Sequence, residues 1–279
     1  MSAPFERPSG LLSVLGILGL CYLTAPVIIV AVMSLSSARY LAFPPPGWST
    51  EWYAKFFTDP AWITATLNSF KLGLSVAMIA TPIGALAAYG LVRRIVPGRR
   101  AITAFLLSPM VVPVIVSAIS LYGFYVALGI SGGFLGILIA HVILAVPLVT
   151  IAVAGILRRL NPAIETAAAS LGASPAKVFV SVVLPNIVPG IVSGALFAFM
   201  TSFDELVIAM FVGGRTMTLP RKIWEDLVVL VEPTQAAAST FLVLVSVVSL
   251  AVWAFAQSRR DRSGSARPSA LPSGEAEKA

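Results

Sequence analysis

The sequence predicts an all-α, polytopic membrane protein with six transmembrane helices. Hydrophobic residues make up 58% of its 279 residues, charged residues make up only 11%, and the mean hydropathy is +0.93. Long apolar runs alternate with short segments rich in proline, glycine or charge. Backbone polar groups inside lipid must be hydrogen-bonded within the protein, so apolar runs of about 20 residues have to form helices. We therefore expect no β-sheet.

The six predicted spans, within a transmembrane domain at 11–257, are 11–35, 68–92, 101–128, 134–157, 187–212 and 236–257. The first span is too long for the core of a secretory signal and lacks a cleavage site, so we expect a retained helix that tolerates Pro26. Residues 1–10 form a short polar N-terminus. The tail 258–279 is rich in Ser, Pro, Arg and Ala and is expected to be disordered.

An aromatic stripe lies between the first two spans. Trp48, Trp52 and Phe56 are spaced four residues apart, which suits a short helix at the membrane surface. The pattern leaves two interpretations open, a simple interfacial anchor or a docking surface for an external partner.

The basic residues predict which side of the membrane each loop faces. With six spans, both termini share a side with 93–100 and 158–186, and these four segments hold thirteen of the nineteen Lys and Arg residues. Cytoplasmic loops carry the excess of positive charge. Both termini and the 158–186 segment are therefore predicted to be cytoplasmic.

The 158–186 segment is expected to form two short helices separated by a break. Its small-residue run at 165–170 favours a helix with little bulk on one face, which lets another protein approach closely. Gly172 can end this helix in the left-handed region, and Ser174 followed by Pro175 can begin the next. Pro185 is then expected to stop that second helix.

This segment resembles the cytoplasmic coupling loop of the membrane permease subunits of ABC importers. The loop has the pattern Glu-Ala-Ala, three residues, Gly, nine residues, Ile, one residue, Leu-Pro. Gly172, Leu184 and Pro185 fit the spacing, with Val182 in place of the Ile. The local pattern alone also allows an ordinary amphipathic hairpin between two transmembrane helices.

The chain departs from the family pattern at the glutamate. The family's position falls on Thr166, whereas Glu165 lies one residue earlier, a shift that turns a helical side chain by about 100°. The residues that the resemblance assigns to ATPase coupling are Glu165, Thr166, Ala167, Ala168, Gly172, Leu184 and Pro185.

The resemblance covers about residues 60–257 and implies the permease fold of a type I ABC importer in a bacterial inner membrane. It implies pairing with a second, homologous permease subunit, contact with two copies of an ATPase, and delivery of solute by an extracytoplasmic binding protein. ATP and Mg²⁺ would be bound by the partner ATPase, and this chain would be a non-catalytic subunit with no cofactor. Thr166 to Pro185 would dock in the ATPase.

Acidic residues inside the fifth predicted span need an explanation. A carboxylate at the centre of a bilayer costs about 2.5–3.5 kcal/mol on insertion scales, so it usually faces a bundle interior or a wet cavity. Phe203, Asp204 and Glu205 are therefore the candidate substrate-path residues. In a continuous helix Asp204 and Glu205 point about 100° apart, so we expect one to line the path and the other to pair with a base such as Lys71. Alternatively, both acids merely tie helices together.

The Ser-Phe-Asp-Glu segment at 202–205 is similar to one branch of these permeases. Together with Thr-Leu-Pro at 218–220 and Ile-Trp at 223–224, it resembles the permeases of spermidine and putrescine importers. Carboxylates at the outer mouth would attract a cationic polyamine.

Several function classes are excluded or disfavoured by the residues. No Gly-x-x-x-x-Gly-Lys-Ser/Thr phosphate loop is present, so this chain is not the motor. The lone His141 and the lone Cys21 suggest packing roles, and the basic residues lack the aromatic interleaving of a nucleic-acid site. Two rivals remain: an ion-gradient-driven secondary transporter with Asp204, Glu205 and His141 as its relay, and a non-transporting membrane scaffold.

Overall fold

The computed structural model describes residues 10–93, 97–129 and 132–264. The described part is helical and contains no β-strand, in agreement with the all-α prediction; one isolated antiparallel bridge pairs Ser36 with Trp48. Most of the predicted N-terminal segment (residues 1–9) and residues 265–279 of the predicted tail lie outside the described residues.

Within the described residues, five helical stretches are long and apolar enough to cross a membrane, and a bent pair supplies a sixth candidate. The five are α1 (Gly10–Met33), α3 (Pro60–Arg93), α6 (Phe134–Arg159), the continuous stretch Pro175–Asp204 and α12 (Pro233–Gly264). Three of these spans differ clearly from the prediction. α3 begins at Pro60 rather than at residue 68, and α12 continues beyond residue 257 into the first residues of the predicted tail. The fifth span, predicted at 187–212, is the stretch Pro175–Asp204.

The predicted third span, 101–128, is not one continuous helix. It consists of α4 (Arg99–Leu107), a 3₁₀ turn η1 (Ser108–Met110) and α5 (Val114–Ala127), and the two parts are bent by 98°. Pro113 precedes α5 with an extended backbone (ψ 130°). Because proline lacks an N–H and disfavours a helical conformation in the residue before it, the chain leaves the helix here and starts a new one in another direction.

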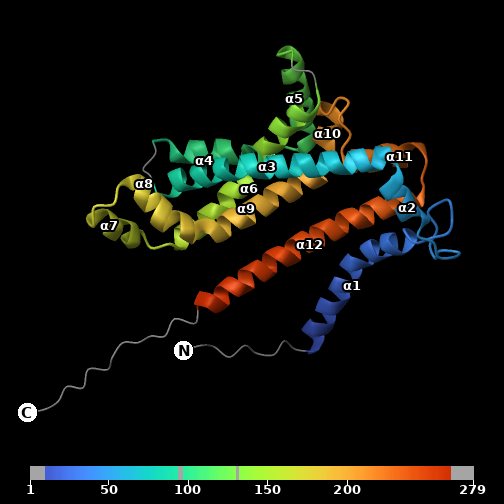
Figure 1. The fold of residues 1–279 in the computed structure, drawn as a ribbon, viewed down its shortest axis with the longest axis horizontal. Coiled ribbons are helices and arrows are strands. Elements are labelled where there is room, and N and C mark those ends of the chain that lie inside the picture. The colour runs from blue at the N-terminus through green and yellow to red at the C-terminus, as the bar shows by residue number, and fades with distance from the viewer. Residues whose placement is uncertain (1–9, 94–96, 130–131, 265–279) are drawn as a thin grey trace, which may run out of the picture.

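The core is a layer of three helices, α3, α6 and α9 (Leu184–Asp204), which lie side by side (Figure 1). Glycines allow the close approach. A Cβ at Gly84 of α3 would lie 2.6 Å from the Val149 Cβ of α6, and a Cβ at Gly194 of α9 would lie 2.9 Å from Val149 Cγ1. Gly190 and Gly194 form a G-x-x-x-G pair, the small-residue pattern by which membrane helices pack backbone to backbone. Val149 is therefore held between two glycine surfaces.

The remaining helices surround this layer. α12 contacts both α9 and α1, while α1 has no buried residue of its own. α2 (Glu51–Thr58) and α11 (Leu219–Val229) lie near one end of the bundle, and α7 (Pro162–Ser170) and α8 (Pro175–Val178) lie at the other (Figure 1). α10 (Val207–Val212) packs against α5.

The aromatic stripe between the first two predicted spans lies only partly at the surface. Trp48 is 70% exposed, but Trp52 and Phe56 in α2 are buried, with exposed fractions of 8% and 2%. The Trp52 Nε1–H donates to the Ser36 carbonyl at 2.7 Å, and the Phe56 ring lies 5.7 Å from the Trp62 ring of α3. α2 is therefore fixed to the bundle by these side chains, so that it is more than an interfacial anchor.

Candidate functional site

The first helix of the 158–186 segment, α7, ends just before Gly172 as its sequence predicts, and its start at Asn161 is a finding of the structure. The Asn161 side chain caps the start by accepting the Ala163 N–H at 3.0 Å. At the other end, Gly172 has a φ of +86°, and the N–H groups of Gly172 and Ala173 reach back to the carbonyls of Ala169 and Ala168 at 2.9 and 3.2 Å. These paired bonds satisfy carbonyls that a helix end otherwise leaves open, in the arrangement for which glycine is favoured.

The predicted stop at Pro185 is wrong. α8 begins as predicted, with the Ser174 side chain accepting the Lys177 N–H at 3.4 Å, but it continues through a π-helical turn, η2 (Phe179–Val183), directly into α9. In this turn the Leu184 N–H bonds to the Phe179 carbonyl, five residues back. The wider turn frees the carbonyl that the proline ring would meet in an α-helix, so the helix passes through Pro185 without a break.

The 158–186 segment has an anchored side and an exposed tip. Val178 and Val183 are buried, the Phe179 ring packs 4.9 Å from the Tyr89 ring of α3, and Leu184 packs against the core. At the tip, Leu171 is 90% exposed and Ile164 is 47% exposed. The other predicted coupling positions are exposed at Thr166, Ala167, Gly172 and Pro185 and half-buried at Ala168. The segment thus offers an apolar surface while its base is fixed to the bundle.

Glu165 does not belong to that exposed surface. Its carboxylate forms an ion pair with Arg93 at the end of α3, with Arg93 Nε 2.7 Å from Glu165 Oε1 and side-chain exposures of only 11% and 15%. Arg93 also donates to the Leu160 carbonyl at 2.8 Å. Because Glu165 lies one residue before the family's glutamate position at Thr166, its side chain points toward the bundle. Glu165 therefore ties α7 to α3 and offers no charge to a partner.

The two acids of the fifth predicted span lie at a break in the helix. α9 ends at Asp204, Glu205 has an extended backbone (ψ 117°), and α10 begins at Val207. The Glu205 Oε2 accepts the Ile208 N–H at 2.8 Å and so caps α10. The prediction that only one of the two acids faces the path assumed a continuous helix, and the structure shows that the helix is broken at this point.

Both carboxylates line a cavity of about 690 Å³ between the α9–α10 junction and α12. Asp204 is exposed there and forms no hydrogen bond or ion pair with any residue that the structure describes. The remaining lining is largely apolar and consists of Phe197, Met200, Thr201, Leu206, Val207, Ser246 and Leu250. The cavity can therefore hold a ligand with both positive charge and alkyl surface.

Two predictions about neighbours of these acids fail. Phe203 is only 1% exposed and stacks with Phe199 in a cluster with Phe56 and Trp62, so it lies in the core and not on the cavity. Within the described residues Lys71 forms no ion pair with either acid; the group that faces Glu205 is His141.

His141 is a hydrogen-bonded packing residue, as predicted, but its position was not foreseen. It is 1% exposed on α6, and its Nδ1 lies 2.9 Å from Ser202 Oγ of α9. Its Nε2 lies 3.7 Å from Glu205 Oε2. Ser202 and His141 are separated by 61 residues in the chain, and the sequence pattern carries no signal that brings these two positions together.

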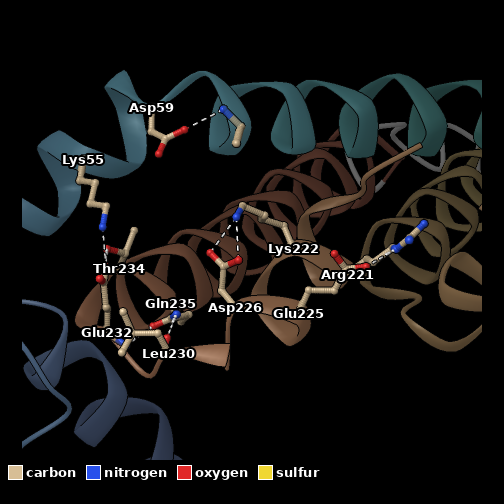
Figure 2. Close-up of polar contacts among 11 residues, drawn as sticks. Lys55, Asp59, Arg221, Lys222, Glu225, Asp226, Leu230, Glu232, Thr234 and Gln235 are labelled. Carbon is tan, nitrogen blue, oxygen red and sulfur yellow. Dashed lines mark hydrogen bonds and ion pairs between the residues drawn. The ribbon is translucent and has the colours of Figure 1, made fainter. Parts of the chain in front are cut away.

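A polar cluster lies at the end of the bundle that carries α2 and α11, away from α7 and α8 (Figure 2). Lys55 of α2 reaches across to Glu232 just before α12, and Lys222 of α11 bonds both oxygens of Asp226 at 2.6 and 2.8 Å. Gln235 accepts the Glu232 N–H at 2.7 Å and donates to the Leu230 carbonyl at 2.8 Å. These acids have basic partners, in contrast to Asp204, so the cluster joins α2, α11 and α12.

Comparisons with known proteins agree with this architecture. A family model described as "Binding-protein-dependent transport system inner membrane component" matches residues 80–261. The chain is 35% identical over 246 residues to the putrescine transport system permease protein PotI of Escherichia coli K12, covering 85% of this chain and 87% of that protein. It is 33% identical over 226 residues to the spermidine/putrescine transport system permease protein PotC of Haemophilus influenzae, covering 81% and 88%.

Solved structures share the fold at lower identity. A chain of a bacterial ABC transporter that imports the acidic polysaccharide alginate matches with a TM-score of 0.66 and 16% identity, covering 90% of this chain and 95% of that one. A chain of the MetNI methionine ABC transporter in an inward-facing conformation matches with a TM-score of 0.59 and 20% identity, covering 76% and 97%.

Proposed function

Because the chain belongs to the family of binding-protein-dependent transport system inner membrane components, we propose that it forms half of the path of an ATP-driven polyamine importer. The cargo would be a small polyamine such as putrescine or spermidine, for which the permeases PotI and PotC are named. An ion-gradient-driven transporter is not favoured, since the relatives and the structural neighbours are permeases of ABC systems.

The cavity at the α9–α10 junction is the observation that carries the cargo assignment. A polyamine is an alkyl chain with ammonium groups, and the cavity combines two carboxylates with a largely apolar wall. Its volume of about 690 Å³ lies within the usual range of small-molecule sites, roughly 300–1,000 Å³. Asp204, which has no partner among the described residues, would take an ammonium directly, and the apolar wall would contact the methylene groups.

The 158–186 segment would receive the energy for transport. Its apolar tip around Ile164 and Leu171 would dock in a partner ATPase, which would bind ATP and Mg²⁺, while Arg93 and Glu165 keep α7 attached to α3. Closure of the ATPase would then move α6 and α9 together and exchange the access of the cavity between the two sides.

The remaining partners follow from the same proposal. A second, homologous permease subunit would complete the path, and an external binding protein would deliver cargo at the end that carries α2 and α11. Both termini and the 158–186 segment would then be cytoplasmic, as the basic residues predict.

Reconstitution of the complete complex tests the proposal. The chain, its second permease and its ATPase are placed in liposomes with the binding protein, and ATP hydrolysis is measured with polyamines, amino acids and anions at equal concentrations. We expect stimulation by putrescine or spermidine only. Stimulation by an anion or a neutral amino acid, with no response to polyamines, would contradict the cargo assignment.

A further inference from the structure

His141 has a buried nitrogen that the packing does not use. The side chain is 1% exposed, and its Nε2 has no hydrogen-bond partner within the described structure. Buried polar atoms are almost always hydrogen-bonded, so an unsatisfied one requires an explanation. The acidic group that faces this nitrogen is the carboxylate of Glu205, with Oε2 at 3.7 Å, and Glu205 lines the cavity.

The neighbours of the imidazole determine where its proton lies. On one side, Nδ1 is 2.9 Å from the Ser202 hydroxyl, which can donate or accept. On the other side, Nε2 faces a carboxylate, which only accepts when ionised. A bare nitrogen lone pair would repel Oε2, so the Ser202 O–H donates into Nδ1 and Nε2 carries the hydrogen. Ser202, itself 4% exposed, thereby fixes the tautomer that points a donor at Glu205.

A neutral donor at this place has a different effect from a fixed cation. A lysine or arginine next to Glu205 would cancel the charge that a cationic cargo requires. A neutral imidazole orients the carboxylate and leaves its negative charge in place. The Ile208 N–H already bonds the same oxygen, Oε2, at 2.8 Å, so a bond from His141 would hold that oxygen from two directions.

We propose that His141 is a positioning residue for cargo recognition, whose Nε2–H hydrogen-bonds Glu205 when a cationic amine occupies the cavity. This inference rests on the proposed polyamine transport. The separation of 3.7 Å needs to shorten by less than about 1 Å to reach hydrogen-bond length. The cargo ammonium and the imidazole then hold the same carboxylate, so that the affinity for a polyamine depends on a residue that the polyamine does not touch.

The test compares variants of the complete complex in liposomes by titrating putrescine and measuring ATP hydrolysis. His141→Leu keeps the bulk but removes the donor, and we expect the half-saturating putrescine concentration to rise about tenfold with the maximal rate changed by less than about twofold. His141→Gln, which keeps an N–H donor, should return the half-saturating concentration to within about threefold of wild type. Thr150→Val is the matched control on α6, since the buried Thr150 hydroxyl bonds, among the described residues, only to the Gly84 and Val146 carbonyls. We expect it to change neither quantity.

Two further variants separate positioning from packing. Ser202→Ala leaves the imidazole in place but releases its tautomer, and it should raise the half-saturating concentration in the same direction. His141→Leu added to Glu205→Gln should have no further effect, because the carboxylate that His141 positions is already lost. The inference would be overturned by additive effects in the double variant or by a fall in maximal rate alone. It would also be overturned if the half-saturating concentration stayed unchanged in both His141→Leu and Ser202→Ala. A wild-type complex that does not respond to putrescine or spermidine would instead overturn the proposed function on which it rests.

Discussion

At the scale of single residues, Asp204 and Glu205 are neighbours with different surroundings. Asp204 ends α9, is exposed in the cavity and has no hydrogen-bond or ion-pair partner in the described part of the chain. Glu205 lines the same cavity, but its carboxylate also caps α10 through the Ile208 N–H. Asp204 can therefore be changed at the cost of cargo binding alone, whereas Glu205 contributes to the local fold as well.

Alanine substitutions distinguish these two roles. We expect Asp204→Ala to weaken polyamine stimulation of ATP hydrolysis about tenfold without changing the melting temperature of the purified protein, because it removes one charge-assisted contact. Glu205→Ala should also lower the melting temperature, since losing an N-terminal cap costs about 0.5–2 kcal/mol. Glu225→Ala, which breaks only an ion pair with Arg221 at 41% exposure of Glu225, is the control and should change neither. Equal losses of both quantities from the two cavity variants would contradict the distinction.

Gly172 is required for its backbone and not for its size. Its φ of +86° lies in the left-handed region, yet a Cβ at this position would meet no atom of the described residues within 4 Å. A side chain therefore costs only backbone strain, of about 1–2 kcal/mol for most residues and less for asparagine.

Two substitutions of similar volume isolate that strain. We expect Gly172→Val to displace the tip of the 158–186 segment and to abolish most cargo-stimulated ATP hydrolysis in liposomes. Gly172→Asn should retain more than about half of it, because asparagine enters the left-handed region readily. If valine were tolerated as well as asparagine, coupling to the ATPase would not depend on the observed geometry of the tip. That result would agree with the alternative of a non-transporting scaffold.

At the scale of elements, the three-helix layer depends on close backbone contacts at Val149. Gly84 from α3 and Gly194 from α9 approach this side chain from two directions. Gly90 lies on the same helix as Gly84, but a Cβ there would meet no described residue within 4 Å. Gly84 and Gly90 thus differ in whether another helix occupies the adjacent space.

This contrast predicts opposite effects of the same substitution. Gly84→Ala places a Cβ 2.6 Å from Val149 Cβ and 3.0 Å from the Val146 carbonyl, and overpacking of this kind costs about 1–3 kcal/mol. Gly90→Ala should leave stability unchanged or raise it by up to about 1 kcal/mol, because alanine is the better helix former. The measurement is the melting temperature of the detergent-purified protein. Equal melting temperatures for the two variants would show that the α3–α6 approach is looser than described.

The elements also show how far sequence reasoning reaches. Length and hydropathy predict the spans of α1, α3, α6 and α12, and local chemistry predicts the end of α7 before Gly172 and the start of α8 after Ser174, because these depend on nearby residues alone. The bend at Pro113, the π-helical turn before Pro185 and the break after Asp204 were missed because proline and acidic residues also occur inside continuous membrane helices. The pairings Arg93–Glu165 and His141–Glu205 depend on which helices pack together, and one sequence carries no signal for that.

At the scale of the whole molecule, one helical stretch joins the two candidate sites. Residues Pro175–Asp204 form 30 residues of continuous helix from the 158–186 segment to the cavity, which corresponds to roughly 45 Å. α3 and α6 lie beside it (Figure 1). The Arg93–Glu165 ion pair fastens α7 to the same unit. Movement of the tip can therefore reach Asp204 as displacement of a rigid body, provided that the register across the turn η2 is kept.

Deleting Ser181 tests whether the shape of that turn matters. Ser181 is an exposed residue of the π-helical turn, which holds one residue more than an α-helical turn. Removing it leaves an α-helical turn, in which the Pro185 ring meets the carbonyl four residues before it, so the helix is expected to bend at this point. We expect basal ATP hydrolysis by the assembled complex to persist and polyamine stimulation to fall at least about tenfold, because the ATPase would then push the cavity helix in the wrong direction. Ser181→Ala keeps the turn and should behave as wild type. If the deletion retained full stimulation, rigid transmission along α9 would be wrong, and the coupling would have to pass through α3 and α6.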